Sequence, residues 1–75
     1  MREIKLNTES IKLDQFLKWA NLVSTGGEAK VIIKAGDVKV NGEIEERRGR
    51  TLKENDVIEY QDIEYKIITL SLIHI

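Results

Sequence analysis

The spacing of the apolar residues changes along this chain, and the change restricts it to a fold that mixes helices and strands. Between residues 11 and 35 the apolar side chains recur every three or four positions, which is the spacing of helices that bury one face. From Val38 onward they alternate with polar ones, as in a strand with one buried face. Asn41-Gly42 follows, a dipeptide typical of tight hairpin turns. The pattern predicts an α+β domain.

Two short helices are expected in the first half of the chain. The first begins at Ile11, after a polar break at residues 7–10 with helix-capping character. Its apolar stripe comprises Leu13, Phe16, Leu17, Ala20 and Val23. The second begins at Thr25, because Thr25 and Glu28 have the spacing of a capping box, and it ends at Gly36. Its inward face comprises Ala29, Ile32 and Ile33. A tight connection joins the two helices into a corner.

Strands are expected at residues 2–6, before the helices, and at several places after them. The later part of the chain contains strands at 38–40, around Ile44, at 57–60 and at 63–68, a polar loop at 45–50, and turns at 52–56 and 61–62. This order predicts a two-helix corner packed on a small, mainly antiparallel sheet. Residues 1–70 are expected to form a single domain, and residues 71–75 are either a last strand or a tail.

Length and composition exclude several classes of protein. Seventy-five residues form only one small core, and no stretch has the roughly 18 consecutive apolar residues of a membrane helix. The chain has no cysteine and a single histidine, His74, so disulfides and thiolate metal sites are excluded. No nucleophile, carboxylate pair or central histidine base is placed for catalysis. We therefore expect a cytoplasmic domain with no catalytic residues, no cofactor, no metal and no membrane contact.

The charges are unevenly distributed, although the net charge is only −1. Residues 11–53 carry nine basic and six acidic side chains, whereas residues 54–75 carry five acidic ones and Lys66. A net charge near zero argues against a nonspecific nucleic-acid binder, but a chain polarised in this way can present one basic face. Mixed charge that only keeps the domain soluble is the alternative.

Basic residues and two glycines make up the candidate binding site. Gly26 and Gly27 open the second helix, where free backbone N–H groups and the helix dipole favour a phosphate. Alternatively, they only form the tight turn. Arg47, Arg48 and Arg50 crowd one loop and their guanidinium forks suit phosphates, although the neighbouring glutamates can neutralise them. The remaining candidates are Lys30 and Lys34 on one face of the second helix, Lys12 and Lys18 outside the apolar stripe of the first, and Lys53.

Several segments resemble one known family. They are residues 11–18, Leu22-Val23-Ser24, Glu28-Ala29-Lys30, and the stretch 33–42, which ends in Gly36-Asp37-Val38-Lys39-Val40-Asn41-Gly42. With the turn and strand at 52–58, they look like the "S-four" RNA-binding domain, which is named after the fourth protein of the small ribosomal subunit and is also called the alpha-L motif. The resemblance covers residues 11–60, and it is to small stand-alone bacterial members in particular.

This resemblance implies a non-catalytic domain that docks on structured RNA, ribosomal or transfer RNA, through phosphate contacts. It implies that Lys39 and Asn41, on the strand and turn beside the second helix, also bind RNA, and that Lys30 and Lys34 lie on the RNA-facing helix. Many members have a Ser-Arg pair where this sequence has Thr25-Gly26, so one basic residue of the family is missing. Ribosome-associated proteins are further candidate partners, and the domain is expected to be a monomer. The alternative is a protein-interaction module that keeps the fold and binds RNA weakly or not at all.

Overall fold

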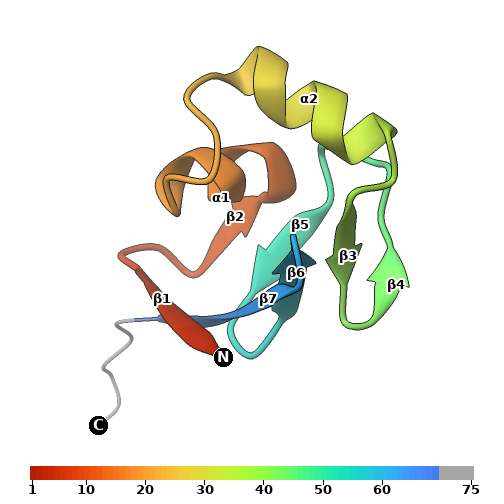
Figure 1. The fold of residues 1–75 in the computed structure, drawn as a ribbon. Coiled ribbons are helices and arrows are strands. Elements are labelled where there is room, and N and C mark those ends of the chain that lie inside the picture. The colour runs from red at the N-terminus through yellow and green to blue at the C-terminus, as the bar shows by residue number, and fades with distance from the viewer. Residues whose placement is uncertain (70–75) are drawn as a thin grey trace, which may run out of the picture.

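The computed structural model describes residues 1–69 (Figure 1). Over this range the chain forms two helices, α1 (Leu13–Trp19) and α2 (Gly26–Lys34), and seven strands, β1 (Arg2–Leu6), β2 (Ser10–Lys12), β3 (Val38–Val40), β4 (Glu43–Ile44), β5 (Thr51–Lys53), β6 (Val57–Tyr60) and β7 (Ile63–Thr69). The predicted order of one strand, two helices and several further strands is confirmed except that a second strand, β2, precedes the first helix. The expectation for residues 71–75 lies outside the described residues.

Five of the strands form one sheet in the order β1-β7-β6-β3-β4. Neighbouring strands run antiparallel except β1 and β7, which run parallel with Ile4 opposite Ile67. The sheet is therefore mixed and mostly antiparallel, as predicted. β2 and β5 pair separately as a two-stranded antiparallel ribbon.

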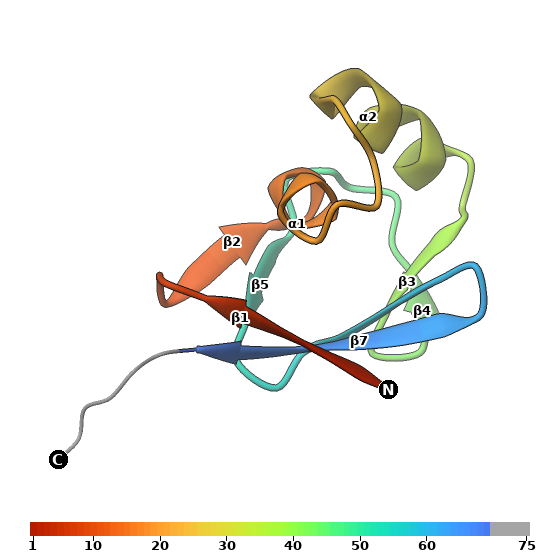
Figure 2. The same cartoon turned by 60° about the vertical axis from the view of Figure 1, so that its left-hand side comes forward.

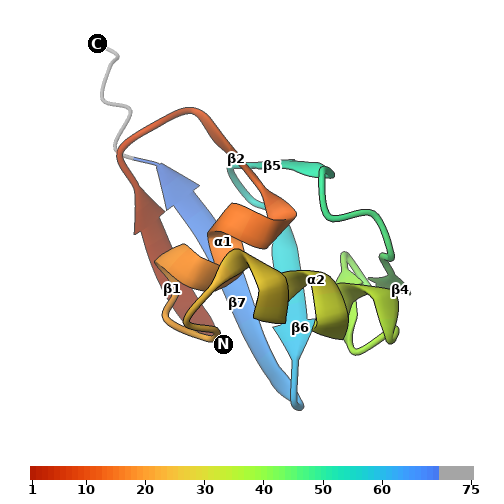
Figure 3. The same ribbon diagram turned by 90° about the horizontal axis from the view of Figure 1, so that it is seen from above.

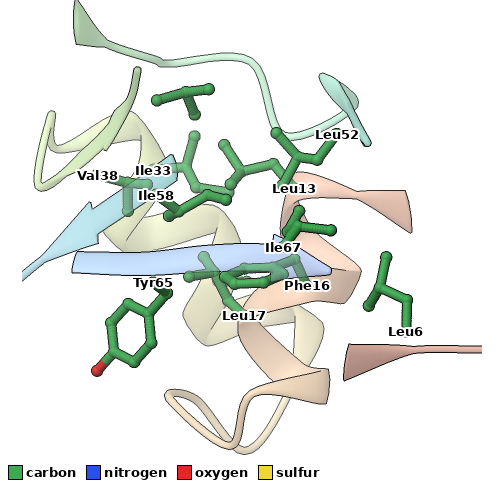
Figure 4. Packing of buried hydrophobic residues seen from close by; sticks show 12 residues of the cluster. Leu6, Leu13, Phe16, Leu17, Ile33, Val38, Leu52, Ile58, Tyr65 and Ile67 are labelled. Carbon is green, nitrogen blue, oxygen red and sulfur yellow. The ribbon is translucent and has the colours of Figure 1, made fainter. Parts of the chain in front are cut away.

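Both helices pack on the same side of the five-stranded sheet (Figure 2). The core between the helices and the sheet (Figure 4) comprises the buried apolar residues Leu6, Leu13, Phe16, Leu17, Ala29, Ile33, Val38, Val40, Leu52, Ile58, Tyr65 and Ile67. The inward residues predicted for the helices belong to this core or, like Ile32, pack against it partly buried. Strand alternation supplies the rest, because Val38 and Val40 face the helices while the residue between them is exposed.

The predicted limits of α2 are confirmed by its hydrogen bonds. The Thr25 hydroxyl oxygen accepts from the Glu28 N–H (3.1 Å), and the Glu28 carboxylate accepts from the Ser24 N–H (2.7 Å). This is a capping box with one difference: the Glu28 carboxylate accepts from the N–H of Ser24, one residue before the N-cap Thr25, instead of from Thr25 itself. Gly36 has a φ of +80° just after the helix, a conformation that residues with a Cβ adopt at a cost.

The predicted start of the first helix is wrong. Ser10–Lys12 is not the opening of the helix but strand β2, and α1 begins only at Leu13. The predicted turn at 52–56 likewise begins too early, because Thr51–Lys53 forms β5. Both errors have one cause: β2 and β5 become strands by pairing with each other across 41 positions of sequence, with Ile11 opposite Leu52. Local propensity does not reveal such a pairing. Neither helix described in residues 1–69 is long and apolar enough to cross a membrane.

Candidate nucleic-acid interface

The loop that carries three arginines is fixed to the start of α1 through its backbone. We call residues 45–50 the arginine loop. The Leu13 N–H donates to the Arg50 carbonyl oxygen (2.9 Å), and the Asp14 N–H donates to the Arg48 carbonyl oxygen (3.1 Å). These bonds satisfy two of the N–H groups that the first turn of a helix leaves without a partner, where the N-cap residue offers no side-chain cap. The arginine loop therefore caps α1, and its side chains are held around the beginning of that helix.

Glu45 links two of the three arginines. Its Oε2 accepts from the Arg47 Nε–H (3.0 Å) and from the Arg47 backbone N–H (3.1 Å), and its Oε1 accepts from Arg50 Nη1 (2.7 Å). The Glu45 side chain is only 9% exposed, against 77% for Arg47. The hydrogen bond from the Arg47 side chain, followed by that from Arg50, lowers the pKa of Glu45 from 4.5 to about 2. The same contact raises the pKa of Arg47.

This pairing leaves guanidinium donors available at the surface. A guanidinium has five N–H donors, and Glu45 accepts one from the side chain of Arg47 and one from that of Arg50. Arg48 is exposed and forms no ion pair with any of residues 1–69. With two glutamates and three arginines, the arginine loop has a net charge of +1. The loop thus offers positioned guanidiniums despite its glutamates.

The ribbon next to the arginine loop adds two lysines. Ile11 lies opposite Leu52, which is buried, while Lys12 and Lys53 are exposed. Since Lys12 faces Thr51 and strand residues two apart share a face, Lys12 and Lys53 lie on the same outer side of the β2–β5 ribbon. Lys12 directly precedes α1 and Lys53 ends the strand that follows the arginine loop, so the structure brings both to this loop.

Helix α2 carries a second basic strip. Ala29 and Ile33 face the core, and Lys30 and Lys34, also four residues apart, are exposed together beside them.

Gly26 and Gly27 open the same helix, and the space beside both is open. A Cβ added at Gly26 would have no neighbour within 4 Å, and one added at Gly27 would meet only the Thr25 hydroxyl, at 3.7 Å. The fold does not need glycine at these positions for space.

Lys18 lies at the opposite end of α1 from the arginine loop. It is exposed and lines a hollow together with Ile11, Gln15 and Trp19. Trp19 is 51% exposed, and its Nε1–H donates to the Lys5 carbonyl oxygen (2.9 Å). The indole therefore ties α1 to the edge strand β1, and part of its ring remains open to solvent.

Lys39 lies away from the other candidate residues. Val38 and Val40 point toward the helices, so Lys39 between them projects from the opposite face of the sheet. On that face its cross-strand neighbour is Glu59. Lys39 therefore lies on the sheet face opposite the helical corner, although its partner on β4, Ile44, directly precedes the arginine loop.

Asn41 has a structural role in the turn after β3. Its Nδ2 donates to Asp56 Oδ1 (3.2 Å), its Oδ1 accepts from the Val57 N–H (2.9 Å), and its own N–H donates to the Val57 carbonyl oxygen (2.7 Å). With a φ of +53° it also forms the hairpin turn with Gly42. The side-chain amide is thus used to join the β3–β4 turn to the start of β6.

Glu45 is one of the neighbouring glutamates that the sequence offered as ion-pair partners of the arginines, and the structure shows that it pairs with two of them from a buried position. The sequence feature that indicates this role is its position, two residues before Arg47 and five before Arg50, but its burial depends on the tertiary fold.

Within residues 1–69, no three histidine, cysteine, aspartate or glutamate residues are grouped so that they could hold a metal ion.

From above (Figure 3), the helices lie over the sheet, and the link from β4 to β5 runs along one side of α2 while the β6–β7 turn lies on the other. The lysines of the ribbon and the arginine loop thus gather at one end of the helical layer, and α2 contributes its own strip. Backbone hydrogen bonds join the arginine loop to α1. The basic side chains of these neighbouring elements together form a surface suited to a polyanion.

The amino-acid sequence of this chain is similar to those of known proteins. The model of the S4 domain family matches residues 4–68. A protein of Bacillus subtilis (strain 168) named "Probable ribosome maturation protein RlbA" is 45% identical over 58 residues, which cover 77% of this chain and 82% of that protein.

A solved structure has a similar fold. It is the 30S ribosomal protein S4e from Thermoplasma acidophilum, which superposes with a TM-score of 0.60 at 25% identity. The similarity covers 80% of this chain and 32% of the ribosomal protein, so the chain corresponds to about a third of that protein.

Proposed function

Because this chain belongs to the S4 domain family, whose members usually bind RNA, we propose that it is a non-catalytic module that docks on structured RNA. The observation that carries this proposal is the arginine loop, whose carbonyl groups cap α1 and in which Glu45 holds the side chains of Arg47 and Arg50 in place. The basic residues Lys12, Lys18, Lys30, Lys34, Arg47, Arg48, Arg50 and Lys53 would contact phosphates.

The mechanism is electrostatic docking onto the RNA backbone. Each lysine or arginine that neutralises a phosphate releases condensed counterions, which favours binding at low salt. The guanidiniums of Arg47 and Arg50 are already oriented by Glu45, so they lose less conformational freedom on binding than free side chains would. Recognition would follow the shape and phosphate spacing of the RNA more than its base edges.

The start of α2 would receive one further phosphate. The N–H groups of Gly26 and Gly27 belong to the first turn, where the helix supplies no acceptor, and the open space beside both residues allows close approach of a phosphate. Lys30 follows on the same helix. These backbone donors would replace the arginine that many family members have here.

Ribosomal RNA is the target that the relatives favour. The Bacillus subtilis relative is named as a probable ribosome maturation protein, and the structural relative is a protein of the 30S ribosomal particle. We infer that this chain acts on ribosomal RNA during maturation of the ribosome, with transfer RNA as the second choice of target.

The test is fluorescence anisotropy with labelled ribosomal and transfer RNA fragments at several salt concentrations. We compare Arg48→Ala and Lys34→Ala, on the proposed surface, with the matched control Lys39→Ala on the far face of the sheet. Each phosphate contact that is lost should reduce the slope of log K against log salt by about 0.7 to 0.9. Lys39→Ala should leave the slope unchanged. Equal losses for all three variants would contradict the proposed surface.

A protein-interaction module with weak RNA affinity is the second candidate. It is favoured by the ion pairs of Glu45 with Arg47 and Arg50, which neutralise part of the arginine loop. The absence of saturable RNA binding at low salt, with the fold verified by circular dichroism, would support this second function.

A further inference from the structure

A groove runs along α2, and neither of the two lysines of this helix lines it. Its lining is mainly apolar (Leu22, Val23, Val31, Ile32 and Tyr60) and also includes Glu28 and, at one end, the start of the helix at Thr25 and Gly27. Val31 is 67% exposed and lies beside the other apolar residues of the lining. The groove therefore offers apolar surface to solvent.

The helix divides its side chains into separate strips. Residues four apart share a face, so Glu28 lies with Ile32 and Lys30 lies with Lys34, while Ala29 and Ile33 face the core between the two strips. Tyr60 of β6 lines the groove beside the first strip. The lysines do not line the groove, but on the solvent side of α2 the exposed Val31 lies between the two strips, three residues before Lys34.

A second hollow adjoins the groove at Tyr60 and is acidic. Its charged residues are three carboxylates and one ammonium, namely Asp37, Glu59, Asp62 and Lys39. With Glu28 in the groove itself, negative charge borders the Tyr60 end of the groove and attracts cationic side chains. The hollow and the groove together combine apolar contact with negative charge.

We propose that this groove docks a segment of a partner protein that carries apolar side chains next to lysines or arginines. The apolar side chains would cover Val31 and Ile32, and the cationic ones would reach Asp37 and its neighbouring carboxylates. This inference goes beyond RNA binding: the chain would hold a basic protein segment at the Tyr60 end of the groove while RNA contacts the arginine loop, the lysine strip and the start of α2. Charge complementarity selects the partner, since neither RNA nor an anionic membrane fits a carboxylate rim.

The test is an NMR titration of the ¹⁵N-labelled full chain with a synthetic peptide. The probe is a peptide of about 12 residues with two leucines four positions apart, flanked by lysines, so that one helical face is apolar. Shifts are expected at Glu28, Val31, Ile32 and Tyr60. One control peptide has serine in place of leucine and another has glutamate in place of lysine, and both should bind at least about tenfold more weakly.

Two variants of the protein test the groove and its rim. Val31→Lys, at an exposed position, should weaken binding of the leucine–lysine peptide by about tenfold or more, and Asp37→Lys by about threefold. The matched control is Gln15→Lys, which adds the same charge on the exposed face of α1 and should leave the peptide affinity unchanged. Equal peptide affinity for Val31→Lys and Gln15→Lys would overturn the proposal.

A titration in the presence of saturating RNA separates this inference from the proposed function. Peptide shifts at the groove should persist when RNA is bound, whereas competition between the two ligands would overturn the inference of separate sites. If the chain binds no RNA, the peptide titration alone still decides the groove. Concentration-dependent dimers that lose their interface in Val31→Lys would identify a second copy as the occupant and refute a basic partner.

Discussion

Replacing Glu45 with glutamine removes one negative charge from the arginine loop and keeps the shape of the side chain. In the native protein the carboxylate accepts three hydrogen bonds, two from guanidiniums and one from the Arg47 backbone. Glutamine has one oxygen for these donors, and its NH₂ group would point at a guanidinium. We therefore expect Glu45→Gln to lose at least one charge-assisted hydrogen bond and to loosen the loop that caps α1.

The size of the effect follows from those contacts. A hydrogen bond to a charged group contributes about 1.5 to 3 kcal/mol, and the bond from Arg50, whose side chain is 34% exposed, lies at the lower end because water screens part of it. We expect a loss of about 1.5 kcal/mol at pH 7. In a domain of this size such a loss lowers the melting temperature by roughly 6 to 12 °C.

The difference in stability between the native protein and the Glu45→Gln variant should depend on pH. The pKa of Glu45 in the folded protein is lowered from 4.5 to about 2, so the unfolded chain binds this proton at a higher pH than the folded one. The stabilisation is consequently complete above pH 4.5 and is lost as the pH falls toward 2. Glutamine does not titrate, so the stability gap between native protein and variant should close over this range.

Urea denaturation, followed by circular dichroism between pH 7 and pH 2, measures the gap. Because the acidic conditions weaken the whole domain, a ¹³C NMR titration of the Glu45 carboxyl group provides an independent measurement of its pKa. Glu46→Gln is the matched control, since Glu46 is exposed and forms no ion pair within the described residues. A Glu45 pKa near 4.5, or equal stability of the two variants at pH 7, would refute the role assigned to Glu45.

Three further substitutions test the local structure. Thr25→Ala removes the hydroxyl that caps α2 and should cost about 1 kcal/mol in chemical denaturation; restoration by Thr25→Ser would confirm that the hydroxyl is responsible. Asn41→Ala deprives Asp56 of one donor and leaves a backbone N–H without its acceptor, so we expect a loss of about 1 to 3 kcal/mol, and an unchanged urea midpoint would contradict the structural role. Gly36→Ala forces a residue with a Cβ into a φ of +80° and should cost about 1 kcal/mol, measurable as a lower melting temperature, whereas Ala35→Gly one position earlier provides a comparison without positive φ.

The features that could be predicted from the sequence are those with local causes. The capping box at Thr25 and the hairpin at Asn41 each involve residues within a few positions of one another, so the sequence contains the whole signal. The alternation around Lys39 already indicated that its side chain points away from the core. The basic residues of the interface were visible for the same reason, since charge is a property of single residues.

The S-four resemblance adds longer-range information, because it depends on the order and spacing of several segments. It led to the family and to the correct fold, with the two-helix corner packed on a mostly antiparallel sheet. It also grouped Lys39 and Asn41 with the binding residues. In the structure Lys39 lies on the sheet face opposite the helices. The side chain of Asn41 forms hydrogen bonds with Asp56 and with the Val57 N–H.

The sequence by itself therefore determined the order of the elements other than β2 and β5, the inward faces of the helices and the supply of positive charge. Only the tertiary structure decided that residues 10–12 form a strand, that carbonyl groups of the arginine loop cap α1, and that Glu45 is buried between two arginines. Each of these depends on partners about 35 to 43 positions away or on burial, and hydrogen bonds of this kind form only after the core has brought distant segments together.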